Sequence, residues 1–241
     1  MRLSDFSGLF KKSTAQFVRA ENPFDDYFLV YFKPAEGTTW SPGEHAAFRL
    51  PRSGIKGRNF RAFSLASVPQ EGHILLGTRT GPQASAYKQR LLGLKAGDPV
   101  IVHGPFGWFK LQDDTSPVVL FAAGVGITPI RALLLQLSTS APRPIELVFA
   151  SEKNYLFENE IDALSESMPQ LHVHKTRDIE STQSALRLCA EKYGNSAYYY
   201  ISAAPGVIQS TGKLLGKFGI KSRRRISDPF FGYSAKGKRK T

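Results

Sequence analysis

Residues 118–130 read Val-Val-Leu-Phe-Ala-Ala-Gly-Val-Gly-Ile-Thr-Pro-Ile, an apolar run that passes through a Gly-x-Gly turn into helix-forming sequence. A strand, a glycine turn and a helix in direct succession present backbone amides and a positive helix end to a pyrophosphate. Pro129 stands where the Gly-x-Gly-x-x-Gly motif has its third glycine, and proline is well tolerated in a first helical turn. The stretch predicts a nucleotide-binding unit, and an ordinary strand-to-helix turn is the alternative that the motif alone leaves open.

Downstream of this stretch, apolar strands alternate with amphipathic helices. The expected strands are 118–122, 145–150, 172–175, 198–202 and 226–231, and the expected helices are 129–137, 157–166, 183–193 and 207–218. Strands buried on both faces between helices indicate a parallel, doubly wound sheet, which binds ligands beyond the carboxyl ends of its strands.

Upstream, short strands alternate with turns rich in glycine and proline. The expected strands are 27–32, 45–50, 62–66, 74–80 and 100–103, with one helix at 84–92 that Ser85 can cap. This spacing favours an antiparallel β-barrel. The sequence pattern changes near residue 113, so we predict a barrel domain over 1–112 and a nucleotide-binding α/β domain over 113–241.

Composition narrows the chemistry that the chain can perform. The 241 residues are 41% hydrophobic, which is ordinary for a globular protein. No stretch of the sequence approaches the ~18 to 20 uninterrupted apolar residues that a membrane span requires. The start of the chain lacks the apolar centre of a signal peptide, so a cytoplasmic protein is expected. The single cysteine, Cys189, excludes an intramolecular disulfide and a four-cysteine cluster, and the five histidines show no metal-binding spacing. Redox chemistry would therefore need an organic cofactor, and no metal site is predicted.

The net charge of +12 is concentrated at one end, because residues 219–241 alone contribute +7. One interpretation is a solubilising tail at about 234–241, and the other is an electrostatic landing site for an acidic partner.

The segment Arg61-Ala62-Phe63-Ser64 lies at an expected strand edge in the barrel. An arginine can neutralise a phosphate, and an aromatic ring can lie against a planar heterocycle. The amides near Ser85 could meet a second phosphate at a helix start. Each feature has an ordinary structural alternative, an exposed arginine beside a core ring and a capped helix.

The order of these segments resembles the ferredoxin-NADP reductase superfamily. Its barrel carries Arg-x-Tyr/Phe-Ser for flavin, and its second domain opens with Gly-x-Gly-x-Thr-Pro for NAD(P)H. The matching residues are Arg61, Phe63, Ser64, Gly124, Gly126, Thr128 and Pro129. Similar stretches are Gly97-Asp98, Gly-Pro-Phe-Gly at 104–107, Phe-Glu-Asn-Glu-Ile at 157–161, and the ending Asp-Pro-Phe-Phe-Gly-Tyr at 228–233.

The resemblance implies a set of site residues. The expected cofactor-binding residues are Arg61, Ala62, Phe63, Ser64, Arg79, Ser85, Gly124, Gly126, Thr128, Ser151, Lys153, Phe231 and Tyr233. Thr128 and Ser202 are the expected catalytic residues at the hydride-transfer site, where Ser202 stands at a position that is cysteine in many relatives. A helix start at Ser85 favours FAD over FMN.

The electron donor is expected to be NADPH or NADH. Ser151 and Lys153 would suit the 2′-phosphate of NADPH, Glu152 would repel it, and Arg177 could supply a further cation.

The function implied is hydride transfer from NAD(P)H to FAD and onward electron transfer to an acceptor such as ferredoxin, flavodoxin or a ferric siderophore. The alternatives are a reductase of free flavins, and a non-catalytic nucleic-acid-binding module that would use the basic residues 223–225 and 236–240.

Overall fold

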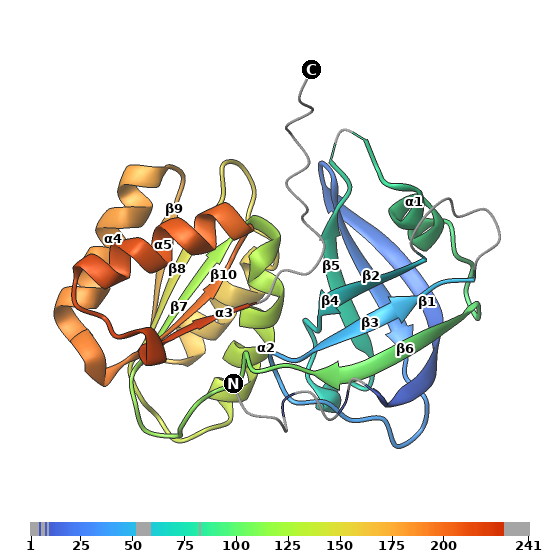
Figure 1. Cartoon of the computed structure of the whole chain (residues 1–241), viewed down its shortest axis with the longest axis horizontal. Helices are drawn as coiled ribbons and strands as arrows, with labels where there is room; N and C mark the ends of the chain where they lie inside the picture. Colours follow the sequence, from blue (N-terminus) through green and yellow to red (C-terminus); the bar gives the residue numbers. More distant parts are fainter. Residues whose placement is uncertain (1–4, 6–7, 9, 52–58, 82, 229–241) are drawn as a thin grey trace.

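The computed structural model describes residues 5, 8, 10–51, 59–81 and 83–228, and these form two units that lie side by side (Figure 1). We call the unit built on the first sheet the barrel unit and the unit built on the second sheet the α/β unit. The chain passes from one to the other between Phe106 and Val118.

The barrel unit is a six-stranded antiparallel sheet with the order β4-β3-β6-β1-β2-β5. Its strands are β1 (Lys12–Phe24), β2 (Tyr27–Lys33), β3 (His45–Arg49), β4 (Phe60–Ser64), β5 (Ile74–Arg79) and β6 (Pro99–Phe106), and its helix is α1 (Ala86–Leu92). Alternate residues point inward and build a core that includes Phe32, Phe48 and Leu76, and Tyr87 and Leu91 of α1 pack against it. The expected antiparallel sheet is confirmed.

Strand β1, the longest of the described strands, was not expected from the sequence. Its pairing with β2 shifts register twice, between Phe17 and Arg19 and between Glu21 and Phe24. Each bulge resets the alternation of inward and outward side chains, so the period-two signal of a strand is lost.

The α/β unit is a five-stranded parallel sheet with the order β11-β10-β7-β8-β9. Its elements are β7 (Val118–Ala123), α2 (Ile127–Ser138), β8 (Ile145–Ala150), α3 (Glu158–Ser167), β9 (Leu171–Thr176), α4 (Ile179–Tyr193), β10 (Tyr198–Ser202), α5 (Pro205–Lys217) and β11 (Arg225–Ser227). Helices α2 and α3 pack on one face and α4 and α5 on the other, which confirms the doubly wound sheet. The described part of β11 is shorter than the expected strand 226–231, whose end lies outside the described residues.

The two units share one hydrophobic cluster, in which Tyr27 and Leu75 of the barrel meet Ile127 and Ile130 of α2. At the edge of this contact the buried Arg131 of α2 makes ion pairs of 2.7 Å with Glu71 and with Glu160, and it donates a 2.7 Å hydrogen bond to the Ala66 carbonyl. Apolar packing and a paired, buried cation therefore hold the carboxyl edge of the parallel sheet against the barrel. Among the described helices, none has the length and apolar character needed to cross a membrane.

Candidate active site

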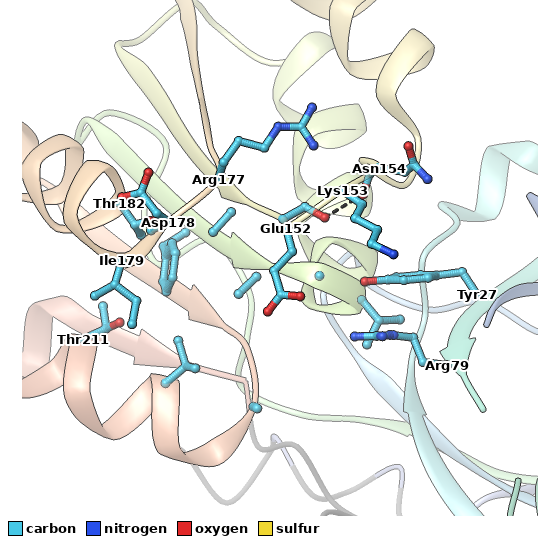
Figure 2. A pocket seen from close by; sticks show the side chains of 18 of the residues that line it. Tyr27, Arg79, Glu152, Lys153, Asn154, Arg177, Asp178, Ile179, Thr182 and Thr211 are labelled. Carbon is cyan, nitrogen blue, oxygen red and sulfur yellow. Dashed lines mark hydrogen bonds between the residues drawn. The ribbon is translucent and has the colours of Figure 1, made fainter. Parts of the chain in front are cut away.

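A cavity of about 1180 Å³ opens at the carboxyl edge of the parallel sheet, where that edge faces the barrel (Figure 2). The barrel contributes Tyr27 and Arg79 to its wall. The α/β unit contributes the turn at Gly124 and the loops that follow β8 and β9, with Lys153 and Arg177 among their residues. Such crevices are where parallel α/β sheets bind their ligands.

The glycine turn fits this wall only because two of its residues lack side chains. Gly124 has a positive φ of 54°, and a Cβ there would lie 3.0 Å from the Tyr27 hydroxyl. A Cβ on Gly126 would lie 2.0 Å from the backbone oxygen of Ser202. Helix α2 starts directly after the turn, and among the described residues no side chain caps it. The amide of Ile127 already donates to the carbonyls of Gly124 and Val125, so the amides that an anion could meet are those of the glycine turn itself.

Thr128 is buried at the contact between the two units. Its hydroxyl donates a 3.1 Å hydrogen bond to the Val125 carbonyl, and a Cβ on Gly77 of β5 would lie 2.4 Å from its methyl carbon. The side chain therefore wedges the glycine turn against the barrel.

Asp228 lies at the centre of the contact, one residue after β11, and is 1% exposed. Its Oδ2 accepts hydrogen bonds from Ser64 Oγ at 2.9 Å and from Ser202 Oγ at 3.1 Å. Its Oδ1 lies 3.2 Å from His45 Nε2. Two hydroxyls that the sequence assigns to different cofactors, one for flavin and one for hydride transfer, thus meet on one carboxylate.

The surroundings hold this group rigidly. His45 is buried on β3, with Gly107 beside its imidazole, where a Cβ would lie 3.2 Å from the ring. The rings of Phe106 and Trp108 lie 5.9 and 6.4 Å from the imidazole. Burying a carboxylate is costly unless polar groups compensate it, and here two hydroxyls donate to Oδ2 while the imidazole lies beside Oδ1. We call Ser64, Ser202, Asp228 and His45 the junction cluster.

A second group of polar side chains lies at the start of α1. Arg61 Nη2 donates a 3.2 Å hydrogen bond to Ser85 Oγ, and its guanidinium carbon lies 5.6 Å from the centre of the Tyr87 ring. Arg61 Nε is buried and has no hydrogen-bond partner among the described residues. Phe63 lies beside the same ring at 6.2 Å. An unsatisfied buried guanidinium nitrogen fits a phosphate binding here, because the phosphate would supply the missing acceptor.

Lys88, one turn into α1, adds a second cation to this group. Its ammonium donates to the Arg79 carbonyl, and burial, followed by the charge of Arg61, lowers the pKa of Lys88 to about 8. Because the positive charges of Arg61 and Lys88 repel each other, an anion bound near both would be stabilised. This site fits the phosphates of a flavin nucleotide.

The other residues expected at the site have varied positions. Arg79 pairs with Asp26 at 3.1 Å, stacks on Tyr27 and lines the cavity. Ser151 lines the cavity, but its hydroxyl donates a 2.6 Å bond to the Asn154 carbonyl within its own loop. Lys153 is exposed at the cavity wall, and Ala62 is half-buried in β4. Phe231, Tyr233 and the basic tail at 234–241 lie outside the described residues.

Three side chains at the site were not among the expected site residues: Asp228, His45 and Lys88. Asp228 could have been identified from the sequence, because it follows the last strand of a parallel sheet, at the edge where ligands bind. Lys88 could also have been identified, because it lies three residues after the helix cap at Ser85. For His45 the sequence gives no such signal, because its partner is remote in the chain.

No protein-family model matches the chain. It is 26% identical over 211 residues to a flavohemoprotein of Deinococcus radiodurans, across 79% of this chain and 51% of that protein. It is 28% identical over 202 residues to the ferredoxin reductase component of 3-ketosteroid-9-alpha-monooxygenase from Rhodococcus rhodochrous, across 79% of this chain and 56% of that protein. The chain thus spans about half the length of these curated relatives.

Solved structures agree on the fold. The cytochrome b5 reductase domain of Ulva prolifera nitrate reductase superimposes with a TM-score of 0.75 at 20% identity, covering 92% of this chain and 98% of that one. A ferredoxin-NADP+ reductase from Plasmodium falciparum gives 0.75 at 15% identity, with the same coverage of 92% and 98%. The chain therefore has the two-domain fold of ferredoxin-NADP reductases, and its sequence is similar to those of flavohemoproteins and ferredoxin reductase components.

Proposed function

We propose that the chain is an NAD(P)H-dependent flavoprotein reductase that holds FAD on the barrel unit and NAD(P)H in the cavity of the α/β unit, with cofactor domains at 1–112 and 113–241. The names of its relatives support this class, since they include flavohemoproteins and a ferredoxin reductase component. One similar structure, a flavohemoglobin from Malassezia yamatoensis, contains bound FAD and heme. The observation that carries the proposal is the junction cluster, where Ser64 and Ser202 share the carboxylate of Asp228.

On the barrel side, the proposal assigns the flavin phosphates to Arg61, Ser85 and Lys88. Their two cations and one hydroxyl offer donors for more than one phosphate group, which supports FAD rather than FMN. The aromatic ring of Phe63 and the hydroxyl of Ser64 are placed on the same strand. The bound flavin would supply the ring that accepts a hydride and then releases electrons.

On the α/β side, the proposal assigns the nucleotide pyrophosphate to the turn at Gly124 and to the start of α2. Ser202 is fully buried and does not line the cavity, so we assign its hydroxyl, which donates a hydrogen bond to Asp228, to fixing the end of β10 beside the glycine turn. Although Asp228 does not line the cavity, its negative charge would favour a positive charge on a nicotinamide bound nearby, which is the form that NAD(P)H takes after it gives up a hydride. The protein's part is therefore positioning and electrostatics.

Replacing Arg61 by Ala is expected to weaken FAD binding by about 1.5 to 3 kcal/mol, the value of a hydrogen bond to a charged group. The reason is the loss of a guanidinium whose buried Nε has no hydrogen-bond partner in the described part of the chain. Fluorescence titration of flavin-free protein with FAD measures the change. Arg19→Ala removes an exposed barrel arginine and serves as the matched control. Equal FAD affinity in the two variants would show that Arg61 does not bind flavin.

FAD affinity should also fall as the pH rises through about 8, where Lys88 loses its proton in the flavin-free protein. A bound phosphate favours the ammonium, so the expected slope approaches a tenfold loss per pH unit above that value. The stability of the flavin-free protein changes in the opposite sense, because the unfolded chain keeps this proton up to about pH 10.4. Titrations across this range should show the slope in the natural protein and not in Lys88→Met. A slope that survives this substitution would contradict the assignment.

We propose NADPH as the preferred donor, since Arg79, Lys153 and Arg177 all line the cavity. Four carboxylates, those of Asp25, Asp26, Glu152 and Asp178, line it too, and Asp26 pairs with Arg79, so the preference is expected to be small.

The acceptor that we propose is an acidic electron-transfer protein such as a ferredoxin or flavodoxin. The support is the net charge of +12, which would steer such a partner by long-range attraction. Reduction of an acidic acceptor protein should slow steeply as ionic strength rises, whereas reduction of a small ferric chelate should change little. Equal salt dependence for both acceptors, measured by stopped flow, would contradict electrostatic steering.

A further inference from the structure

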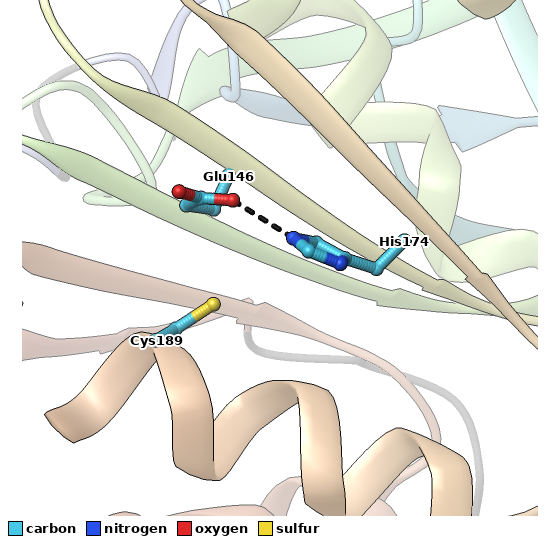
Figure 3. A group of neighbouring side chains, drawn as sticks. All are labelled: Glu146, His174 and Cys189. Carbon is cyan, nitrogen blue, oxygen red and sulfur yellow. Dashed lines mark hydrogen bonds and ion pairs between the residues drawn. The ribbon is translucent and has the colours of Figure 1, made fainter. Parts of the chain in front are cut away.

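A separate polar cluster lies between the parallel sheet and α4. Glu146 comes from β8, His174 from the neighbouring strand β9, and Cys189 from the helix above them (Figure 3). One potential ligand atom from each residue, a carboxylate oxygen, an imidazole nitrogen and the Cys189 sulfur, lies within 4.8 Å of the other two. Glu146 is the second residue of β8, whereas the cavity begins where that strand ends, so this group is distinct from the candidate active site.

We propose that Glu146, His174 and Cys189 form a binding site for a divalent cation of the Zn²⁺ or Co²⁺ class. Carboxylate oxygen, imidazole nitrogen and thiolate sulfur are the three ligand types that Zn²⁺ uses in proteins, and a thiolate disfavours Mg²⁺ and Ca²⁺. Three protein ligands leave a fourth tetrahedral position for water. The spacing of the histidines could not show this site, because its residues come from three separate elements.

The burial of the three side chains suits a closed but reachable site. Glu146 and Cys189 are almost fully buried, and Figure 3 shows the Cys189 sulfur pointing toward the other two side chains. His174 is 37% exposed on the edge strand, which provides a route from solvent. The ligands sit on two strands and a helix, which fix their positions better than a loop would.

The hydrogen bonds of the metal-free cluster define what a cation must displace. Glu146 Oε2 lies 2.8 Å from His174 Nε2, and the cation would replace the proton that they share. Glu146 Oε1 accepts bonds from Lys192 Nζ at 2.9 Å and from Tyr193 Oη at 2.8 Å. The Lys192 side chain is 58% exposed. Its ammonium can therefore move into water when a bound cation neutralises the negative charge of Glu146.

Binding changes protonation and leaves every oxidation state unchanged. Burial raises the pKa of the Cys189 thiol to about 12, so the thiol keeps its proton until a cation displaces it into solvent. His174 would bind through Nε2 as a neutral ring that carries its proton on Nδ1. Three bonds to the cation would tie edge strand β9 and α4 to the centre of the sheet.

The test is a Co²⁺ titration of the full chain, freed of metal with a chelator and carrying no histidine tag. Sulfur-to-cobalt charge transfer produces a near-ultraviolet band, and because the chain has one cysteine, that band in a difference spectrum reports Cys189 alone. We expect a saturable band that Zn²⁺ abolishes by competition, and a higher melting temperature with Zn²⁺. Absence of the band at saturating Co²⁺ would overturn the proposal and leave a structural hydrogen-bond network.

Matched variants locate the site. His174→Gln is expected to weaken Co²⁺ binding by at least about tenfold, since loss of a ligand costs no less than loss of an outer-shell partner. His103→Gln removes a histidine on β6 of the barrel unit, away from this cluster, and should change nothing. Lys192→Gln should strengthen binding, because it removes the competing ammonium from Glu146. Equal affinities in the two histidine variants would refute the site, even if Cys189→Ser fails to fold.

Discussion

Asp228→Asn is expected to slow the reduction of bound flavin by NAD(P)H about 100-fold, the scale of loss that follows when reacting groups are displaced by about 1 Å. The substitution keeps the shape of the side chain but removes the buried charge on which Ser64, Ser202 and His45 converge. The amide oxygen of Asn can still accept from both hydroxyls, so the substitution chiefly removes the charge and turns an NH2 group toward His45 Nε2. Anaerobic stopped-flow absorbance measures the rate directly.

The same variant should lose about 1 to 3 kcal/mol of unfolding free energy, because two hydrogen bonds to a charged acceptor become hydrogen bonds to a neutral one. Circular dichroism must therefore show that the protein is folded at the assay temperature. Asp114→Asn, at an exposed position, is the matched control and should retain the natural rate. A rate for Asp228→Asn within about twofold of that control would show that the carboxylate has only a structural role.

Gly126→Ala is expected to have the second large effect. The added methyl would lie 2.0 Å from the Ser202 carbonyl oxygen, so the glycine turn and the end of β10 must move apart. Overpacking of this kind costs about 1 to 3 kcal/mol of stability. The start of α2 moves with the turn, and we expect the KM for NAD(P)H to rise at least tenfold, equivalent to about 1.4 kcal/mol of binding.

The control for this variant is Gly206→Ala, in the first turn of α5. A Cβ there meets no atom within 4 Å, so stability and KM should stay close to those of the natural protein. Thermal melting and steady-state kinetics on the two variants separate a steric effect from a general loss of glycine. Similar behaviour of both would contradict the close approach of the turn to Ser202.

Local patterns were enough to predict most of the fold. The apolar runs of the second half identify a parallel sheet, because strands that are covered by helices on both faces need no polar side. The glycine turn before α2 could be predicted, because the residues that define it are consecutive in the sequence. Strand β1 could not, because two bulges interrupt the alternation that identifies a strand.

The junction cluster could not be predicted from the sequence. Ser64 and Ser202 were expected to serve different cofactors, but Ser64 meets Asp228 across 164 residues of chain, and no local pattern encodes that contact. Ser151 shows that a suitable residue type is not sufficient. A serine can bind a phosphate, but the Ser151 hydroxyl donates to a carbonyl of its own loop. Residue type and order predicted the reaction class, and only the folded chain brings the participating groups together.

The most direct test of the proposed function is the absorption spectrum of the purified chain after incubation with FAD, followed by anaerobic addition of NADPH or NADH. We predict flavin bands that remain after free FAD is removed and that NADPH bleaches somewhat faster than NADH. Equal bleaching rates would contradict only the preference for NADPH. A protein that shows no flavin bands and binds neither FAD nor FMN would contradict the assignment of a flavoprotein reductase.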